Sequence, residues 1–147
     1  MARVSVQEAV FDLAAEVAGF GKGRADVGAI VTFTGMVRDD SGNLAALEIE
    51  HYPAMTERAI TEIVAEAEGR WHLADCRVIH RYGRLTVGAP IMMVATAARH
   101  RADAFEAAEF LMDYLKSRAP FWKKEIRADG TTWVAAKDSD EKALLRW

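Results

Sequence analysis

The chain has 147 residues, of which 51% are hydrophobic, and its formal net charge is −3. This length suits a single domain, 1–147, and no stretch rich in Pro, Ser or Gly divides it. Outside residues 116–127 the basic residues are dispersed, so composition gives no sign of binding to nucleic acid or to a membrane surface. Any anion that the protein binds is therefore expected to be small.

The single cysteine and the N-terminal residues bear on the compartment. Cys76 cannot form an internal disulfide, and it lies in an apolar run where we expect a buried, unreactive side chain. The N-terminal residues contain no continuous apolar stretch, and no segment reaches the roughly 20 apolar residues that a membrane span requires. We therefore expect a cytoplasmic protein.

A helix is the first predicted element. Ser5-Val6-Gln7-Glu8 fits a capping box, and apolar residues then recur at helical spacing to about Ala18. Residues 19–28 are predicted to form a loop. Its Gly21-Lys22-Gly23 lacks both a preceding strand and a following Ser or Thr, so we do not interpret it as a phosphate-binding loop of the Walker type.

Strands and a second helix are predicted next. Residues 28–38 and 44–52 have strand patterns and flank a turn at 39–43, which predicts an antiparallel pair. Apolar residues at helical spacing predict a helix over 55–70. Two further strands are predicted at 77–85 and 90–97, around a turn at Val87-Gly88.

The last elements are a third helix and a hairpin. The helix is predicted over 102–116, with Phe105, Ala108, Met112 and Leu115 on its buried face, and Pro120 prevents its extension. Strands at 121–127 and 131–135 flank Asp129-Gly130, a strong hairpin signal. The order αββαββαββ lacks regular βα alternation, so we expect an α+β fold with antiparallel hairpins and three main helices. The charged tail, 137–147, is either helical or ordered only against a partner.

The segment 116–125 places four cations around a rigid corner, Pro120-Phe121-Trp122. An aromatic pair is unnecessary in a solvated charge run but useful in a site that desolvates lysines beside an anion. The alternative is a helix C-terminus with cations that complement its dipole, followed by an edge strand. If the protein is an enzyme, Lys116 and Lys123 are the best candidates. Crowding by Arg118 and Lys124 favours a neutral amine, whereas an anionic reactant favours the charged one.

Other cations are predicted at the ends of elements. His100-Arg101 precedes the third helix, where free N–H groups and a cationic pair suit a small phosphate, although an exposed loop pair is the alternative. Arg38 ends the strand that begins at residue 28 and, taken singly, fits a surface arginine.

The remaining histidines are given structural interpretations. Alternation sends His80 and Arg81 to opposite faces of a strand, where either can pair with Glu48 or Glu50. His51 is expected to pack at a strand-to-helix corner. No set of His, Cys and carboxylate residues has the spacing of metal ligands, and no Ser or Cys has a nucleophile signature, so we expect no metal and no cofactor.

Several motifs occur in a characteristic order along nearly the whole chain. They are Phe33-Thr34-Gly35-Met36-Val37-Arg38, Leu47-Glu48-Ile49-Glu50-His51-Tyr52-Pro53, His80-Arg81-Tyr82-Gly83, His100-Arg101 through Ala104-Phe105, Asp113-Tyr114-Leu115-Lys116 through Ala119-Pro120-Phe121-Trp122-Lys123-Lys124-Glu125, and Trp133. In this order they resemble the family of large, catalytic subunits of molybdopterin synthase. Ala54 stands where that family commonly has Gly before the Met, a departure at a corner and not at any proposed catalytic group.

The resemblance implies a fold, an activity and partners. The fold is an α/β-hammerhead type, and the assembly is a homodimer in which each large subunit binds a small ubiquitin-like sulfur-carrier subunit. The carrier's C-terminal Gly-Gly thiocarboxylate supplies sulfur to cyclic pyranopterin monophosphate, which becomes the dithiolene of molybdopterin in molybdenum cofactor biosynthesis. We expect the sulfur donor to be another protein, because this sequence ends in Arg146-Trp147.

The resemblance also implies residue roles. Lys116 is the principal catalytic lysine and Lys123 a second one. Arg38, His100 and Arg101 line the pocket for the substrate phosphate, with Arg38 a candidate for contribution across the dimer. Two other hypotheses stay open: a non-catalytic adaptor for a ubiquitin-like tail, and a lysine enzyme that forms a Schiff base with a small phosphorylated carbonyl compound.

Overall fold

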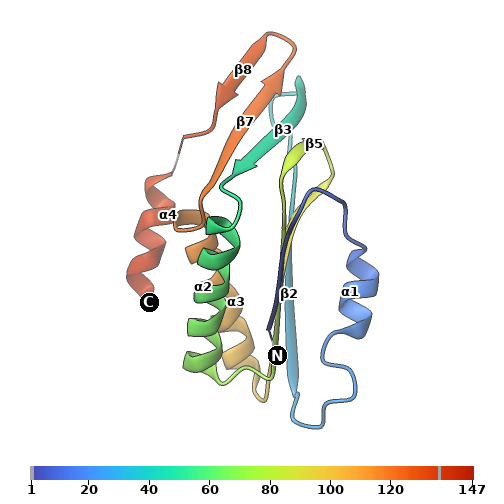
Figure 1. Cartoon of the computed structure of the whole chain (residues 1–147), viewed down its shortest axis with the longest axis vertical. Helices are drawn as coiled ribbons and strands as arrows, with labels where there is room; N and C mark the ends of the chain where they lie inside the picture. The colour runs from blue at the N-terminus through green and yellow to red at the C-terminus, as the bar shows by residue number, and fades with distance from the viewer. Residues whose placement is uncertain (1, 136) are drawn as a thin grey trace.

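The structure is a computed structural model that describes residues 2–135 and 137–147 (Figure 1). Within these residues the elements are β1 (Ala2–Gln7), α1 (Leu13–Gly19), β2 (Ala29–Met36), β3 (Leu44–His51), α2 (Met55–Trp71), β4 (Asp75–Arg81), β5 (Gly83–Thr86), β6 (Pro90–Ala98), α3 (Arg101–Ser117), β7 (Phe121–Arg127), β8 (Gly130–Trp133), α4 (Asp138–Ala143) and the 3₁₀ turn η1 (Leu144–Arg146). No helix in the described ranges is both long and apolar enough to cross a membrane.

The first sheet has the strand order β1-β4-β6-β2 and is covered on both faces. Only its β1–β4 pair is parallel. Helices α2 and α3 lie on one face and α1 lies on the other (Figure 1). Alternation along β4 explains this sandwich, because Val78 packs in the core beneath α2 and α3 while Ile79 packs with Phe11 and Phe20 on the α1 side.

The second sheet has the order β5-β3-β7-β8, is wholly antiparallel, and lies beyond one end of the two long helices (Figure 1). The chain passes from the first sheet to the second between β4 and β5. At this point Gly83 has a φ of +89°, and a Cβ there would lie 2.6 Å from Oε2 of Glu8. A glycine is therefore required where the predicted strand 77–85 divides between two sheets.

Several predicted elements are confirmed. The two long helices, the loop before β2 and the β7–β8 hairpin around Asp129-Gly130 lie close to their predicted places. The mixed α+β class is also confirmed. The tail forms α4 and η1 and is anchored on α3 of the same chain, where Arg146 donates hydrogen bonds of 2.6 Å to both Glu109 and Asp113.

The predicted N-terminal helix is wrong in its first half. The first three capping-box residues, Ser5 to Gln7, belong to β1, which pairs with β4 in a register that places Val4 opposite Val78. Helix α1 begins later, and its N-cap is Asp12, whose Oδ1 accepts a hydrogen bond from the backbone N–H of Ala15 at 3.1 Å. Pairing with the open edge of β4 satisfies backbone groups of residues 2–7 that a helix would have used locally.

The predicted antiparallel pair of strands 28–38 and 44–52 is also wrong. Both strands exist, but β2 pairs with β6 and β3 pairs with β5 and β7. The turn between them is organised by Asp39, whose Oδ1 accepts hydrogen bonds from the backbone N–H groups of Ser41 and Gly42 at 3.0 Å. This Asx-type turn carries the chain from one sheet to the other and does not close a hairpin.

The predicted buried face of the third helix needs one correction. Ala108 and Leu115 are buried, whereas Phe105 is 61% exposed. Small residues of α3, including Ala104 and Ala107, occupy the buried positions near the first sheet. The helix therefore approaches the sheet closely at this end, and the large aromatic side chain lies outside the contact.

Candidate functional site

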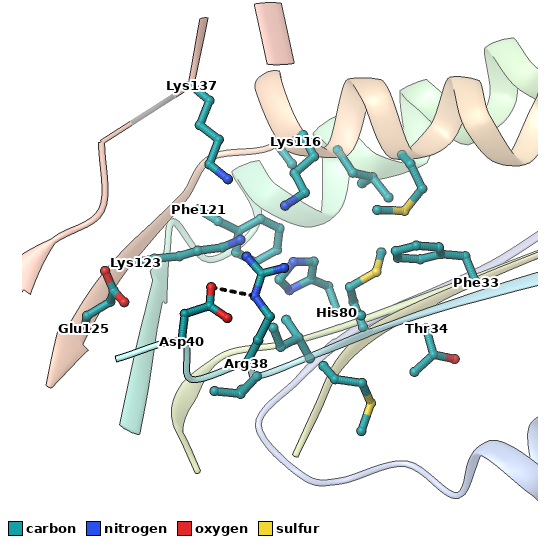
Figure 2. A pocket seen from close by; sticks show the side chains of 18 of the residues that line it. Phe33, Thr34, Arg38, Asp40, His80, Lys116, Phe121, Lys123, Glu125 and Lys137 are labelled. Atoms are coloured by element: carbon teal, nitrogen blue, oxygen red, sulfur yellow. Dashed lines mark ion pairs between the residues drawn. The ribbon is translucent and has the colours of Figure 1, made fainter. Parts of the chain in front are cut away.

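A cavity of about 1020 Å³ lies where the two sheets meet, beneath the C-terminal end of α3. Its walls come from β2 and from three elements that follow one another much later in the chain, β6, α3 and β7. Figure 2 shows Lys116, Lys123 and Lys137 with their side chains directed into the same space as Arg38. The cavity is therefore lined by a group of cations and suits an anion.

Lys116 and Lys123 converge because of the chain reversal between α3 and β7. Lys116 lies in the last turn of α3, where a cation interacts favourably with the helix dipole. After the reversal at Pro120, alternation along β7 directs Phe121 and Lys123 toward the cavity and Trp122 away from it. The predicted convergence of the two lysines is confirmed.

The environment of Lys123 alters its acidity. Burial lowers the pKa of Lys123 from 10.5 to about 8, and the charge of Lys116 contributes to the same shift. The charge of Asp140 opposes this shift, and that of Lys137 adds to it. At pH 7 the amine is mostly charged, yet it deprotonates under mildly alkaline conditions, as a group that exchanges protons near neutral pH should.

The other two cations of the segment 116–125 are neutralised outside the cavity. Arg118 pairs with Glu141 at 2.7 Å. Lys124 pairs with Glu50 at 3.2 Å and lies over the ring of Trp133 at 4.8 Å. The expected crowding by Arg118 and Lys124 is therefore wrong, and Lys116 is the main cation that lowers the pKa of Lys123.

Within the described ranges, neither Lys116 nor Lys123 forms an ion pair, whereas Arg38 does. Its Nε lies 3.0 Å from Oδ2 of Asp40, and its side chain is 78% exposed at the cavity mouth. Arg38 lines the cavity in the same chain as Lys116 and Lys123 (Figure 2). A contribution of Arg38 across a dimer is therefore unnecessary to bring these three residues together.

His100 and Arg101 lie at the opposite end of α3. Fifteen helical steps separate Arg101 from Lys116, a distance of about 22 Å at the usual rise of about 1.5 Å per residue. His100 is the N-cap of the helix, makes no side-chain capping bond, and lines a smaller cavity of about 290 Å³ with Arg99 and Asp103. One chain thus does not bring this pair to the lysine cavity.

Sequence reasoning missed Lys137 and His80 as cavity residues. Lys137 arrives from the tail, whose packing no sequence pattern indicated. Either His80 or Arg81 was expected to pair with Glu48 or Glu50, but those carboxylates pair with Lys124. Arg81 instead donates to the backbone oxygens of Glu8 and Pro90. The alternation of β4 did predict correctly that the two side chains diverge.

The structural interpretations of His51 and Cys76 are confirmed. His51 packs at its corner, with its ring centroid 4.3 Å from that of Tyr82. Cys76 is fully buried, and burial raises the pKa of its thiol to about 12, so it is not a nucleophile. Among the residues that the structure describes, no group of His, Cys and carboxylate side chains is arranged to hold a metal ion.

Comparisons with known proteins show the family to which the chain belongs. The family described as "MoaE protein" matches residues 6–118. The chain is 68% identical over 145 residues to a molybdopterin synthase catalytic subunit of Cereibacter sphaeroides, with 99% of both chains covered. The molybdopterin biosynthesis MoaE protein of Burkholderia ambifaria has a TM-score of 0.85 and 51% identity, covering 100% of this chain and 98% of that one.

A more distant structure shares the fold. It is a complex of subunits 1 and 2 of molybdopterin-converting factor from Helicobacter pylori, with a TM-score of 0.75 and 19% identity, covering 92% of this chain and 90% of that one. The family match spans most of the chain and includes β2, both long helices and Lys116. The chain therefore belongs to the MoaE protein family, the family of molybdopterin synthase catalytic subunits.

Proposed function

We propose that this protein is the catalytic subunit of molybdopterin synthase in molybdenum cofactor biosynthesis. It transfers sulfur from the C-terminal thiocarboxylate of a small ubiquitin-like carrier to cyclic pyranopterin monophosphate and so forms the dithiolene of molybdopterin. The observation that carries this proposal is the pair Lys116 and Lys123, unpaired within the described residues on the wall of one large cavity. We also propose that the two-sheet architecture is of the α/β-hammerhead type.

The lysines provide the charge that this chemistry needs. An ammonium group at Lys116 neutralises the carrier thiocarboxylate. It also stabilises the oxyanion that forms when water adds to the carrier's acyl carbon, after the sulfur has bonded to the pterin, and the C–S bond then breaks to leave a carboxylate on the carrier. An ammonium at Lys123 holds the carrier tail or donates a proton to the oxygen that leaves the pterin. The lowered pKa of Lys123, about 8, supports a role in proton transfer because the group exchanges its proton near neutral pH.

The substrate phosphate is assigned to Arg38, His100 and Arg101. In one chain Arg38 lies at the lysine cavity while the other two lie at the far end of α3. We propose a homodimer in which His100 and Arg101 of a second copy reach this cavity. The helix N-terminus behind them adds free N–H groups that favour an anion.

The proposed assembly is a heterotetramer of two large subunits and two carriers. The carrier's extended Gly-Gly tail enters the cavity, whose dimensions and cationic walls suit a narrow chain that ends in an anion. The fold shared with the Helicobacter pylori complex of two subunits supports such a partner. We further propose a cytoplasmic location.

Reconstitution tests the function directly. The purified chain, mixed with thiocarboxylated carrier and cyclic pyranopterin monophosphate, should yield a dithiolene, detected by chromatography of its oxidised pterin. Carrier binding without dithiolene formation would instead support the adaptor hypothesis. Borohydride trapping of a phosphorylated carbonyl compound on Lys116 would support the Schiff-base hypothesis.

A further inference from the structure

His80 is an imidazole on the cavity wall to which no role has been given. Its side chain is only 5% exposed, and it stacks on Phe121 with ring centroids 3.7 Å apart and an interplanar angle of 17°. Figure 2 shows it among the side chains of Arg38, Lys116 and Lys123. Packing against a flat aromatic ring fixes the imidazole plane and leaves its edge available for polar contacts.

One hydrogen bond determines the tautomer of His80. Its Nδ1 lies 2.8 Å from the carbonyl oxygen of Arg81. A carbonyl oxygen can only accept, so Nδ1 carries the proton and Nε2 keeps a lone pair. Within the described residues, Nε2 is neither hydrogen-bonded nor among the buried polar atoms that lack a partner. It is therefore an acceptor that remains accessible from the cavity.

The groups around this acceptor are mainly donors. Phe121, which stacks on His80, precedes Lys123 by two residues, so both side chains lie on the same face of β7. The charges of Lys123 and Lys116 both act on the imidazole, with Lys123 the stronger. The charged or titratable groups that surround the pair are Lys116 from α3, Arg38 and Asp40 from the turn after β2, His51 from β3, Glu125 and Arg127 from β7, and Lys137 and Asp140 from the tail.

We propose that His80 is a positioning residue whose Nε2 accepts a hydrogen bond from the Lys123 ammonium and fixes that group at the cavity wall. Only the effect of this contact on sulfur transfer rests on the proposed function. No such bond is present among the described residues, so the contact requires the flexible lysine side chain to turn toward the imidazole edge across the cavity that both residues line. It favours the charged lysine, because the acceptor stabilises the ammonium form alone.

The neutral state of His80 suits this role. Burial lowers its pKa from 6.5 to about 3, with a contribution from the charges of Lys123 and Lys116 and against the opposing effect of the hydrogen bond to Arg81. The imidazole consequently accepts a hydrogen bond without removing the proton at neutral pH. Lys123 therefore keeps its proton for the reaction. A carboxylate in the place of His80 would form an ion pair with Lys123, raise the pKa of the lysine and make it a poorer proton donor.

Two amide variants separate the role of Nε2 from that of packing. The amide of His80→Gln reaches the position of Nε2 and can turn its oxygen toward Lys123, whereas the amide of His80→Asn reaches only the position of Nδ1. His80→Phe keeps the aromatic stack and loses both polar atoms. Thermal unfolding and near-ultraviolet circular dichroism should be recorded for each variant.

The first readout needs neither carrier nor pterin. Acylation of Lys123 by a small reagent is followed against pH by mass spectrometry, with Lys124, on the opposite face of β7, as the control. In His80→Asn and His80→Phe the pH at which Lys123 reaches half of its maximal acylation rate should fall by roughly one pH unit, because a hydrogen bond to the charged form is lost. In His80→Gln it should stay close to that of the wild type, and Lys124 should react equally in all four proteins.

The second readout is the reconstituted reaction. The alkaline decline of kcat should move to lower pH in His80→Asn and should be restored in His80→Gln. Equal Lys123 midpoints in all variants would overturn the proposal, as would a Gln variant that behaves like the Asn variant. Nitrogen-15 NMR of the wild type provides a check that needs no variant, because a protonated Nε2 would also overturn it. These outcomes stand apart from a failure of the proposed function, which would leave the acylation results intact.

Discussion

Lys116 contributes charge to the cavity and little packing to the core. Its side chain is exposed at the end of α3, next to the buried Leu115. Lys116→Ala should therefore reduce sulfur transfer by at least about 100-fold, the scale of losing one group that stabilises developing charge. The free energy of unfolding should change by no more than about 0.5 kcal/mol, as measured by urea denaturation.

The matched control for this prediction is Arg118→Ala. Arg118 lies two residues further along and pairs with Glu141 outside the cavity. It should retain nearly normal sulfur transfer. A normal rate in Lys116→Ala, or an equal loss in both variants, would show that the assignment of Lys116 is wrong.

Lys123 should make stability depend on pH in an identifiable direction. The pKa of Lys123 is about 8 in the folded chain, whereas in the unfolded chain it returns to the ordinary value of 10.5. Between these pH values the unfolded chain therefore holds a proton that the folded chain has lost. Stability from this group therefore increases from about pH 8 to about pH 10.5. Below that window the folded state bears the cost of a charged, partly buried amine.

Lys123→Met removes this cost with a side chain that is unbranched like lysine and only one atom shorter. At pH 7 the free energy of unfolding of the variant should be higher by about 1 kcal/mol, a figure reduced to allow for solvent in the cavity. Its melting temperature should therefore be a few degrees higher. The advantage should shrink as pH approaches 10.5, which differential scanning calorimetry at several pH values can measure. A pH-independent difference would indicate a packing effect in place of the charge effect.

At the scale of elements, the C-terminal tail depends on its contact with α3. Trp147 packs near Trp71 and Phe110, with both pairs of centroids 5.6 Å apart, and its Nε1 donates to Asp113 at 2.6 Å. Trp147→Ala should cost about 2 kcal/mol, less than the roughly 3–5 kcal/mol of a fully buried Trp because the ring is partly exposed. Urea denaturation should show the loss, while Leu145→Ala, at a position 86% exposed, should be neutral.

The elements themselves were largely predictable where their signals are local. Helices α2 and α3 were predictable because their apolar residues recur at helical spacing along one buried face. The turn at Asp129-Gly130 was predictable because these two residues favour the backbone conformation of a tight hairpin turn. The first residues were wrongly predicted to be helical because Val6 fits two patterns. It fits the helical repeat that continues after it and also the alternation with Val4 in β1. Residues 2–7 form a strand because they pair with the open edge of β4. That edge is formed by residues 75–81, far along the chain, so no local pattern at the N-terminus reveals it.

Strand partners were less predictable than strands. The hairpin interpretation of β2 and β3 failed because the turn at Asp39 carries the chain from one sheet to the other. The predicted strand at 77–85 likewise divides between the two sheets, at Gly83 with its positive φ. The cavity occupies this junction between the sheets. Lys116 and Lys123 were found because both flank one chain reversal, whereas His80 and Lys137 join them only through tertiary packing.

At the scale of the whole molecule, the proposed site is divided between the two ends of α3. A helix of 17 residues is rigid, so His100 and Arg101 cannot approach Lys116 of the same chain by a local movement. A symmetric dimer resolves this separation, because each copy can present one end of its α3 to the other. Light scattering should then show a dimer, and a persistent monomer at working concentration would contradict the arrangement.

Mixed dimers test whether the site is shared. Chains with Lys116→Ala and chains with Arg101→Ala should each be nearly inactive alone, because every site lacks one group. In a mixed dimer, one site receives Lys116 from one copy and Arg101 from the other and is therefore intact. Random pairing of equal amounts leaves about a quarter of all sites complete, so coexpression should restore about a quarter of wild-type sulfur transfer. If differently tagged variants copurify as dimers and activity is not restored, His100 and Arg101 do not complete the lysine cavity of the other copy.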